Sequence, residues 1–115
     1  MGHTDDAWFT RYADELAACL VDARACAETC ETYLREITHD PDRLRRAVDA
    51  LVAPAAVSRV LIDLLDQPPR LILAAVALCR DLTSTASRDG GWPEAVSAAL
   101  GAVATSAAAL LDSAG

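Results

Sequence analysis

The sequence predicts an all-α protein, built as a single antiparallel four-helix bundle over residues 1–115. Alanine supplies much of the 53% hydrophobic content, whereas aromatic residues supply only 4%. Alanine is the best helix former and is depleted in strands. Apolar residues recur at steps of three and four in four segments, and no segment shows the alternation typical of a strand. The breaks between segments are short, which makes neighbouring helices antiparallel.

The first segment, residues 5–37, is predicted to be one long helix. Its apolar residues repeat every seven positions in two registers, as in a helix that faces the interior of a bundle. One register holds Phe9, Leu16, Ala23, Cys30 and Ile37, and the other holds Tyr12, Cys19, Cys26 and Tyr33. Acidic side chains lie mostly off this stripe, so we expect the opposite face to meet solvent.

Three further helices are predicted, over residues 41–66, 70–87 and 93–112. Asp40 is a favourable N-cap, and Pro41 suits the first helical position, where a missing N–H costs nothing. Pro54 lies inside the second helix, so we expect a kink or a short break there. Two consecutive prolines stop that helix, and two glycines end the next one as a C-cap.

Charge and hydropathy exclude two classes of partner. The formal net charge is -7, and nucleic acid binding needs a positive surface that displaces counterions. The longest apolar stretch, residues 98–111, is shorter than the roughly 18 residues of a membrane span and contains polar residues. Residues 1–6 are polar and acidic, unlike a signal peptide. We therefore expect a cytoplasmic protein with four free thiols and no nucleic acid or membrane partner.

The four cysteines are the candidate metal ligands. Spacings of seven and four residues put Cys19, Cys26 and Cys30 on one face of the first helix. Cys26 and Cys30 are one turn apart, so both sulfurs can reach one ion, and two thiolates suit the soft ion Cu(I). Cys79, on the third helix, is placed to face them across the core. Buried cysteines also act as small apolar fillers, and spacing alone does not separate the two roles.

The chain from Cys19 to Tyr33 resembles the repeat of the cysteine-rich four-helix-bundle copper storage protein family. The first helix of that family carries cysteines at alternating steps of three and four residues, typically followed by alanine and acidic residues. Cys19, Cys26 and Cys30 match ligand positions of the family. Asp22 and Tyr33 stand where further cysteines would be expected.

The third helix is similar around Cys79, with Val76 and Thr83 in place of two other cysteines. The resemblance implies a four-helix bundle, often oligomeric, whose interior holds Cu(I) ions on thiolates. With four thiols, the chain is expected to bind at most one or two Cu(I) ions. The ligands that the resemblance implies are Cys19, Cys26, Cys30 and Cys79.

A small-molecule or catalytic pocket on the same scaffold is the alternative function. Asp22, Tyr33 and Cys19 supply a carboxylate, a phenol and a thiol, which suffice for proton transfer where they share a cavity. The sequence lacks a glycine-rich phosphate loop, a His-x-x-x-His pair and a nucleophile elbow. These residues therefore leave open whether the protein is an enzyme.

A non-catalytic interaction module is the further alternative. The last predicted helix carries a face of small residues, which suits a homo-oligomer or a docked partner helix. This face consists of Ala95, Ala98, Ala99, Ala102, Ser106 and Ala109. Exposed apolar surface would be its structural signature.

Overall fold

The computed structural model describes the backbone of residues 2–114 and the side chains of residues 6–114. Within these ranges every regular element is helical, so the all-α prediction is confirmed. The elements are α1 (Gly2–Arg11), α2 (Ala13–Glu36), α3 (Pro41–Val60), the 3-10 helix η1 (Leu61–Leu64), α4 (Pro69–Asp89) and α5 (Glu94–Ala114).

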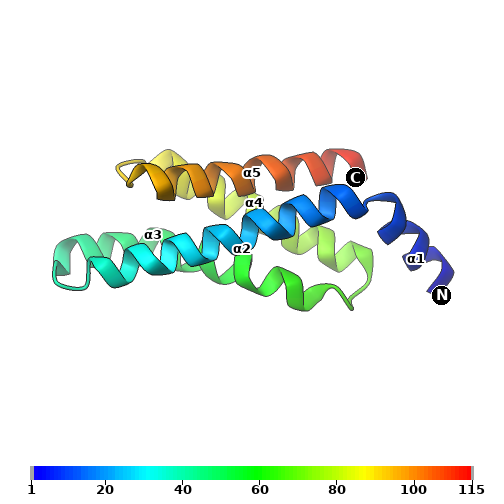
Figure 1. Ribbon diagram of the computed structural model, residues 1–115, viewed down its shortest axis with the longest axis horizontal. Coiled ribbons are helices and arrows are strands. Elements are labelled where there is room, and N and C mark those ends of the chain that lie inside the picture. The colour runs from blue at the N-terminus through cyan, green and yellow to red at the C-terminus, as the bar shows by residue number, and fades with distance from the viewer. Residues whose placement is uncertain (1, 115) are drawn as a thin grey trace.

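The four long helices surround one elongated core. α2 packs against α3 and α5, and α4 packs against the same two helices. Figure 1 shows α5 running along α2, with α3 on the other side of α2. Short turns at residues 37–40 and 90–93 reverse the chain between α2 and α3 and between α4 and α5. The molecule measures 52 × 21 × 17 Å, and its long axis follows these helices.

The first predicted helix is divided, so the prediction of one helix over residues 5–37 is wrong. The break falls at Tyr12, where φ is -109° and ψ is 20°. Figure 1 shows α1 projecting past the end of α2, beyond the other helices. Trp8 packs its ring against those of Phe9 and Tyr12, at centroid separations of 5.1 and 5.5 Å. Because α1 has few contacts with α3, α4 or α5, no neighbouring helix keeps it in line with α2.

α3 begins where the sequence predicts and ends earlier. The carboxylate of Asp40 accepts a hydrogen bond from the backbone N–H of Arg43 at 3.2 Å, which caps the helix. The helix then continues through Pro54, so the chain has no break at that proline. The geometry changes instead at Leu61, where η1 replaces the α-helix predicted to reach residue 66. Short 3-10 turns are common at the C-terminal ends of α-helices.

The turn between α4 and α5 is held by a tryptophan and an arginine. Gly90 and Gly91 adopt left-handed φ angles of 70° and 76°, which glycine adopts without strain. The indole N–H of Trp92 donates a hydrogen bond to the carbonyl of Ala86 at 2.8 Å. Arg46 of α3 lies over the Trp92 ring at 5.1 Å and donates to the carbonyl of Gly90 at 2.9 Å. These contacts tie one end of α3 to the turn.

α5 is strongly apolar, although it contains glycine, threonine and serine. It is the one helix within the described part of the chain that is long and apolar enough to cross a membrane, with a mean hydropathy of 1.6. Alanine raises the mean enough to offset the glycine, threonine and serine. Core helices of soluble proteins pass the same test, so this is weak support for a membrane span. Only 28% of its most apolar window is buried, which leaves much of its alanine-rich surface open.

Candidate functional site

The four cysteines lie in the core of the protein as free thiols. Cys19, Cys26, Cys30 and Cys79 are each 0% exposed. The steps of seven and four residues along α2 place three of them on its buried face, together with Leu16, Ala23 and Tyr33. The fourth comes from α4, between the buried residues Val76 and Thr83. The sequence therefore identified correctly which helix faces carry thiols into the core.

Cys26 and Cys30 form a directly interacting pair on α2. The neighbouring Cys30 thiol and burial both raise the pKa of Cys26, whereas Cys26 lowers the pKa of Cys30 against the opposing effect of burial. Cys26 therefore keeps its proton, and Cys30 is the easier of the two thiols to deprotonate. The two groups titrate as a pair, and the first proton leaves more easily than the second.

Ser58 of α3 extends this pair across the core. Its side chain is buried at 3% exposure, and its hydroxyl lies 3.4 Å from the sulfur of Cys79. Ser58 also lowers the pKa of Cys26, which opposes the effect of burial. A line of polar side chains therefore runs from α2 through α3 to α4. It consists of Cys30, Cys26, Ser58 and Cys79.

Ser58 is not among the site residues predicted from the sequence, although its position indicates a buried hydroxyl. Ser58 lies seven residues after the buried Leu51 and three after the buried Ala55, which places it on the apolar stripe of α3. A hydroxyl at such a position needs a partner in the core. The partner, however, belongs to α4, and its identity depends on how the helices pack.

Cys19 lies at the end of the thiol group nearer to α1. Burial is the main reason that its pKa rises from the ordinary 9.0 to about 12, and the nearby Cys79 and Asp22 raise it further. A hydrogen bond with Ser106 of α5 partly offsets these effects. Burial likewise raises the pKa of Cys79. Cys19, Cys26 and Cys79 are therefore expected to stay protonated at neutral pH.

The two residues that replace cysteines on α4 add no free donor. The Thr83 hydroxyl donates to the carbonyl of Cys79 at 2.8 Å and lies 3.1 Å from the carbonyl of Arg80, within its own helix. Val76 is buried at 1% exposure and has no donor atom in its side chain. Neither residue enlarges the set of soft ligands around Cys79.

The donor set fits a site with few ligands. Among the residues that the structure describes, no three His, Cys, Asp or Glu side chains are grouped so that they could hold one metal ion. The four cysteines that the sequence predicts as ligands therefore do not converge on a single centre. A two-ligand site at the Cys26–Cys30 pair is compatible with this arrangement, because soft thiolates suit Cu(I).

Asp22 and Tyr33 do not share a pocket. Eleven residues separate them along the uninterrupted helix α2, which corresponds to roughly 16 Å of helical rise. Tyr33 is 8% exposed and packs edge-on against Trp92, with ring centroids 6.3 Å apart. Asp22 is half-buried near Cys19. The structure therefore does not bring together the carboxylate and the phenol of the predicted catalytic pocket.

A pocket between α2, α3 and η1 lies next to the thiols. It has a volume of about 360 Å³ and is lined by Leu20, Arg24, Ala27, Ser58, Arg59, Ile62 and Asp63. Ser58 is thus shared by this pocket and the polar line described above. We call this cavity the α2–α3 pocket.

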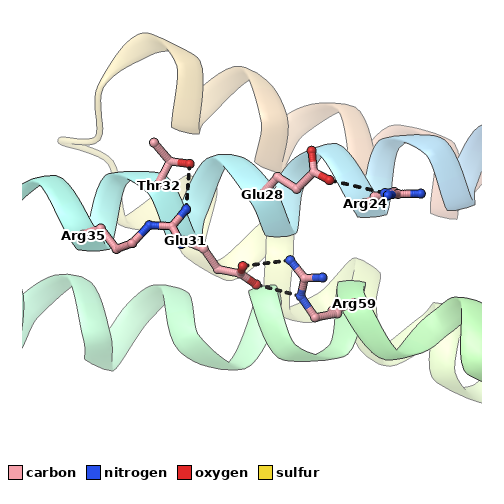
Figure 2. Close-up of polar contacts among 6 residues, drawn as sticks. All are labelled: Arg24, Glu28, Glu31, Thr32, Arg35 and Arg59. Carbon is pink, nitrogen blue, oxygen red and sulfur yellow. Dashed lines mark hydrogen bonds and ion pairs between the residues drawn. The ribbon is translucent and has the colours of Figure 1, made fainter.

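Two ion pairs lie along the surface beside the α2–α3 pocket. Figure 2 shows Arg59 of α3 forming a two-pronged contact with Glu31 of α2, at 2.7 and 2.8 Å. Arg24 contacts Glu28 one turn along α2 at 3.3 Å. The guanidinium of Arg59 lowers the pKa of the Glu31 carboxyl through these hydrogen bonds. The Glu31–Arg59 pair links α2 to α3 and fixes the position of one wall of the pocket.

Comparison with protein-family models, curated proteins and solved structures finds no match to this chain. The residues and their geometry are therefore the basis for the functional argument.

Proposed function

We propose that α2, α3, α4 and α5 form a single antiparallel four-helix bundle that binds Cu(I) on buried cysteine thiolates. Cys26 and Cys30 are the principal ligands in this proposal. The observation that carries it is the direct interaction of two fully buried thiols one helical turn apart. The resemblance of the chain from Cys19 to Tyr33 to copper storage proteins supports the same assignment.

The surroundings of the pair suit a soft, singly charged ion. Cu(I) prefers thiolate sulfur over oxygen ligands, and the core around Cys26 and Cys30 consists mainly of apolar side chains. Metal ligation requires deprotonated thiols, so binding displaces protons that the apoprotein retains. The protein contributes a fixed spacing of the two sulfurs and a core that excludes water.

The number of ions in this proposal is one or two. Cys26 and Cys30 hold the first ion. Cys19 and Cys79 lie close enough to interact electrostatically and would supply a second pair. We further propose that the protein acts in the cytoplasm, where free thiols stay reduced, and that its open apolar surfaces support a homo-oligomer.

Anaerobic titration of the reduced protein with Cu(I), against a chromophoric chelator, tests this proposal. We expect the wild type to withdraw one or two equivalents from the chelator. The double variant Cys26→Ser/Cys30→Ser should lose the tightest equivalent. The matched control Cys19→Ser/Cys79→Ser should keep it, because it removes two buried thiols without touching the pair. Circular dichroism of both variants checks that the helices remain formed.

A second candidate function is supported by a pocket beside Tyr33. This cavity of about 340 Å³ is lined by Tyr33, Arg43, Arg46, Gly91, Trp92 and Pro93. Two guanidinium groups next to aromatic rings suit a small aromatic carboxylate. Thermal-shift measurements with such acids test this alternative. Stabilisation that is lost in Arg43→Gln, while Cu(I) remains unbound, would favour the small-molecule function.

A further inference from the structure

The α2–α3 pocket reaches from the surface of the protein to the thiols. Arg24, Arg59 and Ile62 line it and are exposed to solvent. Ala27 and Ser58 line it from within the core, at 1% and 3% exposure. A molecule in the pocket therefore touches both the outer rim and residues of the core.

Ser58 separates this pocket from two of the cysteines. Its hydroxyl lies 3.4 Å from the Cys79 sulfur, and Ser58 is near enough to Cys26 to lower the pKa of that thiol. A serine side chain is small, and its hydroxyl can exchange one hydrogen-bond partner for another by rotation. Movement of this one side chain would expose both sulfurs to whatever occupies the pocket.

The charges at the pocket nearly cancel, because both lining arginines are held in ion pairs. Two guanidinium groups and one carboxylate, that of Asp63, belong to its lining. The acidic partners of the arginines, Glu28 and Glu31, are outside the lining and meet them from α2, as Figure 2 shows. In a reducing environment Cu(I) is held by small thiolates, because soft sulfur ligands suit this ion.

We propose that the α2–α3 pocket is the access site through which Cu(I), carried by a small thiol, reaches Cys26 and Cys79. This inference rests on the proposed function. As each cysteine sulfur bonds to the ion, one carrier thiolate leaves and takes up the proton that the cysteine loses. Each exchange needs no external base, because the carrier leaves as a neutral thiol and the ion keeps the single negative charge of its two-thiolate complex. On an ion that reaches Cys26, Cys26 displaces the first carrier thiolate and Cys30 displaces the second.

The access site can be tested without copper by modifying the thiols with methyl methanethiosulfonate. A cysteine sulfur attacks the reagent, forms a methyl disulfide and releases methanesulfinate. We compare the wild type with Ile62→Trp, which adds bulk at the exposed rim of the pocket. Val48→Trp is the matched control, because Val48 is a similarly exposed residue on α3 that does not line the pocket. Both substitutions are at exposed positions, so the core is left intact.

We expect Cys26 and Cys79 to be modified before Cys19, which is equally buried and also has a raised pKa, as located by peptide mass spectrometry. Ile62→Trp should slow their modification by about tenfold, the effect of a barrier raised by about 1.4 kcal/mol. Val48→Trp should leave the rates unchanged. Equal rates at all four cysteines, or equal slowing in both variants, would overturn the access site, because global unfolding then exposes the thiols.

The equilibrium titration with Cu(I) separates this inference from the function on which it rests. Ile62→Trp should bind Cu(I) as tightly as the wild type but load more slowly, since the ligands are unchanged. A protein that binds no Cu(I), yet shows the predicted pattern of thiol modification, would refute the copper function and leave the access route standing. Tight binding that loads equally fast in both tryptophan variants would refute the access route alone.

Discussion

The free energy of unfolding of this protein depends on pH through a buried thiol. Burial raises the pKa of Cys19 from 9.0 to about 12 in the folded protein. Above pH 9 the unfolded chain loses this proton whereas the folded protein keeps it, so stability is complete below pH 9 and falls as the pH rises toward 12. We predict that the free energy of unfolding in urea decreases between these limits under reducing conditions.

The variant Cys19→Ala is the control for this effect. It removes the thiol and leaves a constant packing cost, so its unfolding free energy should fall less steeply with alkaline pH. Cys26 and Cys79, whose pKa values are also raised, account for the remaining slope. Identical slopes in the variant and the wild type would show that Cys19 is not desolvated in solution.

The sequence predicts the burial of some residues but not all of their contacts. The buried positions of the three cysteines on α2 follow from their spacing, because helical periodicity fixes which side chains share a face. The contact between Ser58 and Cys79 joins two different helices, and spacing within one helix carries no information on it. The separation of Asp22 from Tyr33, by contrast, could have been derived from helical rise alone.

At the scale of helices, the sequence predicts the buried face of α5 better than that of α3. The buried residues of α5 include Val96, Leu100 and Val103, all on the apolar stripe seen in its sequence. On α3 the buried positions include Ala47 and Ser58, whereas Val48 is 41% exposed. Some large apolar residues thus occur on the outer face of α3, and small residues share its inner face with Leu51. Hydrophobicity alone therefore selects the wrong face at these positions.

The contact between α2 and α3 leads to a prediction for acid conditions. Arg59 lowers the pKa of Glu31, so the pair stabilises the fold above the ordinary pKa of 4.5 and is lost as pH falls through the lowered value. We expect Glu31→Gln to be slightly less stable than the wild type near neutral pH and equally stable in strong acid. Both side chains are well exposed, so the difference should be small and shrink at high salt.

Urea unfolding of the two proteins across the acid range measures this difference. Arg24 and Glu28 form a comparable exposed pair within α2, so Glu28→Gln is a matched control that leaves the α2–α3 contact intact. A difference for Glu31→Gln that grows toward acid pH would contradict the assigned role of the pair.

For the molecule as a whole, the core is expected to dominate stability. Leu51 is 0% exposed, whereas Leu78 is 51% exposed. We predict that Leu51→Ala lowers the free energy of unfolding by about 2–5 kcal/mol, the cost of a cavity in a packed core. Leu78→Ala should cost about 1 kcal/mol or less, because its side chain is already half in water. Chemical denaturation measures both, and equal losses would show that α4 buries a different face.

The central claim for the whole molecule is that its core holds Cu(I) on two thiolates. X-ray absorption at the copper edge, on reduced protein loaded with one equivalent of Cu(I), tests this claim most directly. We predict a Cu(I) edge with a first shell of two sulfur atoms in the wild type and also in Cys19→Ser/Cys79→Ser, in which Cys26 and Cys30 are the remaining thiols. A first shell containing nitrogen or oxygen, in either protein, would contradict the assignment.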